Sequence, residues 1–182
     1  FTVTALEIGE GQQYDMEFEN RNDVTEAEYI EMIRLKTSVL LACAVKLGAL
    51  LADAPAGDVE NLYKFGERIG LAFQLQDDYL DVYGDPKVFG KKIGGDITSN
   101  KKTYMLINAL NKANARQRKE LEKWIGCEAF HRNEKVAAVT ALYNKIGVDR
   151  MAIDCINHYF DEANKYLAAV KVSDERKTEL MA

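Results

Sequence analysis

The sequence predicts an all-α fold. Apolar residues recur at helical spacing over most of its 182 residues, and no segment keeps the strict alternation of apolar and polar residues that marks a strand. Glycine and proline positions divide the chain into helix-sized segments. A chain of this length fits one domain and can bury a sizeable core. We therefore expect helices packed against helices, with residues 1–182 forming a single domain.

The first two elements have different helical signals. Residues 1–18 have weak helix propensity, because several of them are β-branched and two are glycine. Residues 19–23 then form a polar break. Thr25 and Glu28 have the spacing of a capping box, in which each side chain accepts a hydrogen bond from the other residue's backbone N–H. This box predicts a helix from about residue 26 to residue 51.

Loops separate the later helices. The segment 52–58 contains a proline and a glycine, and Asp58 at its end is a plausible N-cap. Gly66 and Gly70 in the next helix either let another helix approach closely or bend their own helix, and the sequence leaves both open. The segment 84–86 predicts a helix stop and a turn. The remaining helices are expected at 59–83, 103–110, 115–124, 135–145 and 149–170.

The helix expected at 59–83 carries an acidic stripe. Gln74, Asp77, Asp78 and Asp81 fall at i, i+3, i+4 and i+7, and at about 3.6 residues per turn they share one face. The other positions of this helix are mostly apolar, so it should be buried. Its carboxylates would then need a cation, because a buried unpaired anion is strongly disfavoured. The plainer alternative is a solvated acidic face, which is what Asp-Asp-x-x-Asp alone on a helix usually means.

A glycine-rich segment with five lysines follows the stripe. These lysines are Lys87, Lys91, Lys92, Lys101 and Lys102. Such a loop behind an acidic helix fits an anion held between ammonium groups and metal ions. Mg²⁺ keeps several waters and prefers one or two carboxylates together with substrate phosphates. A diphosphate would complete a site of this kind.

The stripe and the loop together resemble a known family. The residues that carry the resemblance are Gly70-Leu71-Ala72-Phe73-Gln74-Leu75-Gln76-Asp77-Asp78-Tyr79-Leu80-Asp81, Gly84-Asp85, Gly90-Lys91, Gly94-Gly95-Asp96-Ile97 and Asn100-Lys101. They resemble the second aspartate-rich motif and adjoining loop of the trans-isoprenyl diphosphate synthases, the polyprenyl synthetases that include farnesyl and geranylgeranyl diphosphate synthases. The resemblance implies an antiparallel helical bundle of the isoprenoid synthase type, and it makes residues 1–18 helical.

The resemblance also implies a reaction and its residues. These enzymes are prenyltransferases that condense an allylic prenyl diphosphate with isopentenyl diphosphate by Mg-assisted ionisation, with three Mg²⁺ ions in the complete site, and they are homodimers. By resemblance, Asp77 is the main metal ligand, with Asp78 and Asp81 binding directly or through water. The catalytic positions would be Lys36, Thr37, Gln74 and Asp77, and the substrate-binding positions Lys91, Lys101, Gln12, Asp15, Phe73 and Asp96. Without the resemblance, Lys36 would be expected to snorkel to the surface.

One part of the family pattern is missing. Upstream of Asp77 the chain has no other Asp-Asp-x-x-Asp, which the family uses as its first aspartate-rich motif. The chain therefore resembles the C-terminal half to two thirds of a synthase, with the N-terminal helices missing, and we expect the fragment to be inactive by itself. Two alternatives are a non-catalytic helical subunit of a prenyl synthase heteromer and a class I terpene cyclase.

Composition limits which partners and which cellular compartment we expect. The formal net charge is −5, and no basic stripe is interleaved with aromatic residues, which argues against a nucleic-acid partner. Cys43, Cys127 and Cys155 lie far apart without a Cys-x-x-Cys motif, which favours reduced thiols and a cytoplasmic setting. No signal peptide is visible, and the longest apolar run, residues 39–45, is far shorter than the roughly 20 residues that a bilayer requires. We expect a cytoplasmic protein without a transmembrane segment.

Overall fold

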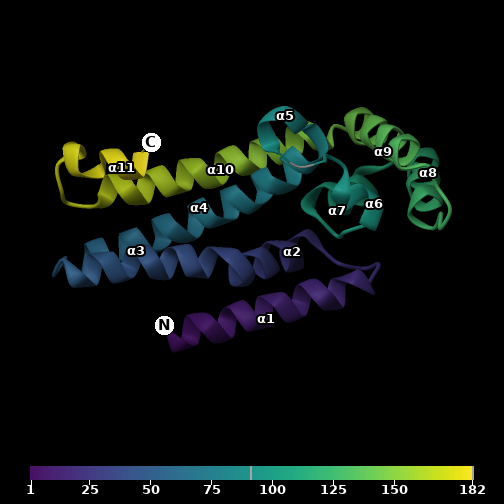
Figure 1. Cartoon of the computed structure of the whole chain (residues 1–182). Helices are drawn as coiled ribbons and strands as arrows, with labels where there is room; N and C mark the ends of the chain where they lie inside the picture. Colours follow the sequence, from purple (N-terminus) through teal and green to yellow (C-terminus); the bar gives the residue numbers. More distant parts are fainter. Residues whose placement is uncertain (91, 182) are drawn as a thin grey trace.

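The structure, a computed structural model, describes residues 1–90 and 92–181 of the chain. Figure 1 shows that helices and the loops between them make up the described residues, which form no strand, and this confirms the predicted all-α class. The helices are α1 (Thr2–Glu19), α2 (Glu26–Ile33), the π-helix η1 (Arg34–Ser38), α3 (Val39–Leu51), α4 (Ala56–Tyr83), α5 (Pro86–Phe89), α6 (Gly95–Ser99), α7 (Tyr104–Lys112), α8 (Ala115–Ile125), α9 (Arg132–Ile146), α10 (Val148–Ala169), the 3₁₀ turn η2 (Asp174–Lys177) and α11 (Thr178–Met181).

Four long elements build an antiparallel bundle. Helix α4 packs against α3 on one side and α10 on the other, and it runs antiparallel to both (Figure 1). Helix α1 lies along the edge of the bundle, where it contacts η1 and α3. The shorter helices α6 to α9 gather at one end of the bundle, near the C-terminal end of α4 (Figure 1).

Helices α2 and α3 form one long rod that is interrupted by the π-helix η1. The rod covers the range predicted for a single helix. It begins with the expected capping box, in which Thr25 accepts from the Glu28 backbone N–H at 3.2 Å and Glu28 accepts from the Thr25 backbone N–H at 2.8 Å. The π-turn adds one residue to the rod, and Lys36 and Thr37 lie within it. Such single π-turns are frequent at functional sites.

The start of α4 differs from the prediction. The helix begins at Ala56 after Pro55, so Asp58 is inside the first turn and does not serve as the N-cap. The Asp58 side chain is only 4 % exposed and accepts a hydrogen bond from the Lys171 backbone N–H at 3.1 Å. The sequence could not reveal this use of Asp58, because Lys171 lies more than a hundred positions further along the chain.

Gly66 and Gly70 allow close approach of the α3 rod to α4, which settles the question that the sequence left open. A Cβ atom at Gly66 would lie 2.8 Å from the Ala42 Cα, and one at Gly70 would lie 2.8 Å from the Ser38 Cβ. Side chains at these positions would collide with the rod. Gly11 plays the same part on α1, where an added Cβ would collide with the Lys36 backbone.

One hydrophobic core joins the long bundle to the shorter helices. It includes Leu75 of α4, Ile97 of α6 and Leu121 of α8, each at most 5 % exposed. All three cysteines are free thiols, as the sequence indicated. None of the helices described here is both long enough and apolar enough to pass through a bilayer.

Candidate active site

The acidic stripe lies on the face of α4 that meets α2, η1 and the segment that begins α6. Asp78 is 2 % exposed, while Gln74, Asp77 and Asp81 are half-buried. The stripe is therefore partly shielded, with Asp78 removed from solvent, and it is not a fully solvated acidic face. Its members have different surroundings, and these decide what each side chain can do.

Asp78 is the most deeply buried residue of the stripe. The Tyr29 hydroxyl donates a hydrogen bond to Asp78 Oδ2, while Oδ1 has no hydrogen-bond partner. Burial raises the pKa of Asp78 to about 7, and the nearby Asp96 carboxylate adds to this effect while the Tyr29 hydrogen bond opposes it. An unpartnered buried oxygen is costly, so Asp78 has an unused capacity to bind a cation.

Asp81 organises the loop that follows. Its carboxylate accepts hydrogen bonds from the backbone N–H groups of Gly95 at 3.2 Å and Asp96 at 3.0 Å. Its backbone carbonyl accepts another from Gly94. Asp81 therefore holds the beginning of α6 against the end of α4, and this contact sets where Asp96 and the lysines after it lie.

A second acidic residue and a lysine face the stripe from the α6 segment. The Lys101 Nζ lies 3.9 Å from the Asp96 Oδ1. Burial raises the pKa of Asp96 to about 6, with the Asp81 and Asp77 carboxylates adding to the rise and Lys101 opposing it. Burial alone would lower the pKa of Lys101, but the surrounding carboxylates, led by Asp96 and Asp78, raise it. Lys101 is thus held as a cation among acidic groups.

The π-turn directs Lys36 and Thr37 toward two different helices. The Lys36 Nζ pairs with Asp15 Oδ2 of α1 at 2.6 Å. The Thr37 hydroxyl donates to Gln74 Oε1 of α4 at 3.2 Å. Lys36 therefore pairs with a half-buried carboxylate of α1, which a lysine extended into bulk solvent would not do, and its role toward a diphosphate stays a prediction.

Two of the residues named from the sequence take no part in these contacts, and a third is not among the described residues. Gln12 is exposed on α1, one turn from Asp15. The Phe73 side chain is 59 % exposed. Lys91 lies outside the described residues, so its assigned role stays a prediction.

Sequence reasoning missed Tyr29 and Asn100. Tyr29 has no predicted role in the site, yet its hydroxyl donates a hydrogen bond to Asp78. Asn100 has a left-handed backbone with φ of 54°, and its side chain bridges two other elements. The signal for Tyr29 was the acidic stripe itself, because a buried carboxylate needs a donor from a facing helix. An Asn after a short helix is likewise a common left-handed cap.

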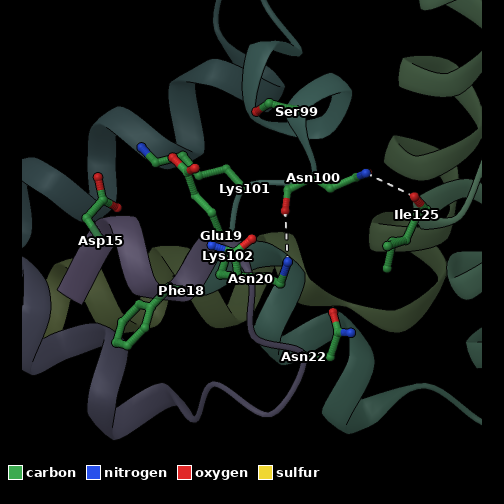
Figure 2. Close-up of a pocket in the computed structure, with 10 residues that line it drawn as sticks. All are labelled: Asp15, Phe18, Glu19, Asn20, Asn22, Ser99, Asn100, Lys101, Lys102 and Ile125. Atoms are coloured by element: carbon green, nitrogen blue, oxygen red, sulfur yellow. Dashed lines mark hydrogen bonds between the residues drawn. The ribbon is translucent and has the colours of Figure 1, made fainter. Parts of the chain in front are cut away.

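A cavity of about 590 Å³ lies between the end of α1 and the segment that follows α6. Figure 2 shows Asp15 and Phe18 of α1 on one side of it, and Asn100, Lys101 and Lys102 from the segment after α6 on the other. The volume is within the range of small-molecule sites, which is about 300–1,000 Å³. Its lining mixes carboxylates, amides and two lysines, which suits an anionic ligand accompanied by cations.

The donor set fits Mg²⁺, which prefers oxygen ligands. Within residues 1–90 and 92–181, no group of three or more histidine, cysteine, aspartate or glutamate side chains is already arranged to hold a metal ion. Tyr29 and the α6 backbone bind oxygens of Asp78 and Asp81. A metal here would need ligands from elsewhere, and Mg²⁺ commonly takes them from substrate phosphates and water.

Comparison with known proteins identifies the family. A sequence model described as "Polyprenyl synthetase" matches residues 1–145. The chain therefore belongs to the polyprenyl synthetase family. The short chain isoprenyl diphosphate synthase of Methanothermobacter thermautotrophicus is 38 % identical over 175 residues, which are 96 % of this chain and 53 % of the relative. The chain thus spans about half the length of the curated relatives that it matches.

Solved structures agree with the family. A geranylgeranyl pyrophosphate synthase has 40 % sequence identity and a TM-score of 0.92, with 99 % of this chain and 56 % of that chain covered. A geranylgeranyl pyrophosphate synthase from Corynebacterium glutamicum, solved with isoprenyl diphosphate and magnesium, has 28 % identity and a TM-score of 0.88, with coverages of 97 % and 50 %. The bundle is therefore that of isoprenyl diphosphate synthases.

Proposed function

We propose that the intact protein containing this chain is a trans-prenyltransferase, which joins an allylic prenyl diphosphate to isopentenyl diphosphate and releases pyrophosphate. The observation that carries the proposal is the meeting of Lys101 with carboxylates from different elements. Asp78 and Asp77 of α4, Asp15 of α1 and Asp96 of α6 all raise the pKa of Lys101. The arrangement is also in a family whose relatives are named as isoprenyl diphosphate synthases.

The residues of this chain would act on the leaving diphosphate and on the allylic cation. Lys36 and Lys101 would neutralise negative charge as it develops on the departing oxygen. The Thr37 hydroxyl and the Gln74 amide, already hydrogen-bonded to each other, would present oxygen atoms toward the positive allylic carbons. Bound Mg²⁺, held by Asp77 and its neighbours, would supply further neutralisation of the diphosphate.

Replacing Asp77 tests this function. In the intact protein, Asp77→Ala should lower Mg-dependent turnover by at least about 100-fold, the scale seen when a group that stabilises transition-state charge is removed. Helicity measured by circular dichroism should hardly change, because Asp77 is only half-buried. Turnover would be followed as pyrophosphate release with an allylic diphosphate and isopentenyl diphosphate.

Asp154→Ala is the matched control, because Asp154 is an exposed aspartate on α10. Its turnover should stay within about twofold of the unchanged protein, since exposed substitutions away from a site have small effects. Near-normal pyrophosphate release by Asp77→Ala would refute the role of Asp77. An intact, folded protein that releases no pyrophosphate at all would favour the non-catalytic subunit instead.

A further inference from the structure

Lys135 of α9 is an unusual buried cation. Its side chain is only 1 % exposed. Its ammonium group contacts two neutral groups: the Nζ donates to Asn100 Oδ1 at 2.7 Å, and it lies 4.3 Å from the ring centroid of Phe130. Lysine is rarely buried this completely unless it is paired. Burial lowers the pKa of Lys135, as expected for an ammonium group removed from water. Such a costly arrangement suggests a task other than filling the core.

Asn100 connects Lys135 to the candidate active site. Its side-chain oxygen accepts from Lys135 of α9. Its Nδ2 donates to the Ile125 carbonyl of α8 at 3.0 Å (Figure 2), so both ends of the amide are held. Its backbone has φ of 54° and ends α6. This left-handed conformation turns the chain directly into Lys101 and Lys102, which line the cavity.

The turn at Asn100 decides where both lysines lie. The Lys101 backbone N–H donates to the Asp96 carbonyl at 3.0 Å, which brings the Lys101 ammonium group to Asp96. The Lys102 Nζ donates back to the Asn100 carbonyl at 3.4 Å (Figure 2). The position of both lysines therefore depends on the backbone turn at Asn100, and the Asn100 side chain ties this turn to α8 and α9.

Two further residues of α9 hold the earlier part of the same segment. Arg132 donates to the Ile93 carbonyl at 2.7 Å. Val136 packs so closely on Gly94, which has φ of 80°, that a Cβ atom at Gly94 would lie 2.5 Å from a Val136 methyl carbon. Arg132, Lys135 and Val136 lie within little more than one turn of α9. The first turns of α9 thus hold the segment from Ile93 to Asn100 at three points.

We propose that Lys135 is a positioning residue for diphosphate binding, which fixes the Asn100 turn and thereby sets the Lys101 and Lys102 ammonium groups in the cavity. The inference rests on the proposed function, since it assigns these lysines to a diphosphate. It adds a residue outside the acidic stripe and the lysine segment. Lys135 itself does not contact the ligand and acts on its binding only through Asn100.

The test compares Lys135→Met with Lys177→Met in the intact protein. Lys177 is also buried, at 5 % exposed, but it lies in η2 and pairs with Asp174. Calorimetric titration with magnesium pyrophosphate should show affinity about tenfold weaker in Lys135→Met, because the Asn100 amide loses a charged donor. Lys177→Met should bind within about twofold of the unchanged protein. Equal affinity in Lys135→Met and the unchanged protein would overturn the proposal.

Asn100→Gly shows whether Lys135 acts through Asn100. It also replaces Lys135→Met in the test if Lys135→Met does not fold. Glycine adopts positive φ readily, so the turn is kept while the amide is lost. Asn100→Gly should weaken pyrophosphate binding to the same degree as Lys135→Met, and the double variant should bind no more weakly than either, as coupled residues do. Binding losses that add in the double variant would overturn the link.

Amide hydrogen exchange of the ligand-free protein separates this inference from the proposed function. Exchange at residues 96–103 should be about tenfold faster in Lys135→Met and unchanged in Lys177→Met, because only the first variant frees the turn. Unchanged exchange there would overturn the positioning role. If the unchanged protein binds no magnesium pyrophosphate, the proposed function fails, and the exchange rates alone then decide whether Lys135 holds the turn.

Discussion

Burial determines the chemistry of Asp78. An ionised carboxylate in this position loses its hydration, and the Tyr29 hydrogen bond, with smaller contributions from Lys101 and Gln74, compensates only part of that loss. The pKa of about 7 means that, without metal, the side chain is largely protonated below neutral pH. A bound cation would reverse this preference, because an adjacent positive charge favours the ionised form.

This property predicts how the stability of the metal-free protein depends on pH. The native pKa of about 7 lies above the ordinary value of 3.8, so the native state binds the proton more tightly than the unfolded state does. The free energy of unfolding should therefore fall as the pH rises from about 4 to about 7, and it should be lowest above that range. The fall should amount to about 1.4 kcal/mol for each unit by which the native pKa exceeds the unfolded one. Asp78→Asn should make this fall much smaller in urea unfolding measured in a metal chelator.

The exposed Asp154 provides a control for the charge change. Asp154→Asn should keep the pH dependence of the unchanged protein. Asp96, whose pKa is about 6, should leave a smaller slope of the same sign in Asp78→Asn. Identical slopes in Asp78→Asn and the unchanged protein would show that Asp78 is ionised in the native state.

At the scale of helices, small residues bring the site together. Gly11 of α1 and Gly70 of α4 both pack against the backbone of η1, from two sides. The π-turn then directs Lys36 to α1 and Thr37 to α4. Close approach of three helices around one distorted turn thus creates two polar contacts that a regular helix at larger separation would not make.

Gly70→Ala should separate α4 from η1. The added methyl group would collide with Ser38, so we expect the free energy of unfolding to fall by about 1–3 kcal/mol, as in other overpacked interiors. The Thr37 to Gln74 contact lies one turn further along α4, so substrate affinity should fall as well. Urea unfolding and calorimetric titration with an allylic diphosphate would measure the two effects.

Gly57→Ala is the control on the same helix, because no atom lies within 4 Å of a Cβ added there. It should be neutral or stabilise by up to about 1 kcal/mol, since alanine favours the helix. Gly70→Ala with the stability of Gly57→Ala would contradict the close approach of α4 and η1.

At the scale of the molecule, we propose that the chain unfolds as one unit. Leu75 in the long bundle and Leu121 among the shorter helices belong to the same core, at 1 % and 0 % exposed. Replacing either with alanine should cost about 2–5 kcal/mol. Leu51→Ala should cost little, because Leu51 is 86 % exposed.

Two probes would test this cooperativity. Trp124, the only tryptophan, lies in α8 against the core and reports on the shorter helices by fluorescence. Circular dichroism reports mainly on the long helices. The two transitions in urea should coincide in the unchanged protein and in both leucine variants. Separate midpoints would mean that the shorter helices form a unit of their own.

The sequence by itself determined the longer helices after residue 25, the acidic stripe and the lysine segment, but not the short helices α5 and α6 within that segment or the π-helix η1. These depend on local periodicity, capping residues such as Thr25, and spacing along one helix, and all of these can be read within a few turns of the chain. The same residues were enough to identify the family. The prediction of Asp58 as an N-cap was wrong, because its side chain makes another contact.

Only the tertiary structure decided which partners the charged groups have. Tyr29 meets Asp78 across 49 positions, Lys135 meets Asn100 across 35 and Lys36 meets Asp15 across 21. Such pairs depend on how far helices approach and rotate against one another, and no periodicity within one helix carries that information. Burial follows from the same packing, and it is burial that raises the pKa of Asp78 and lowers that of Lys135.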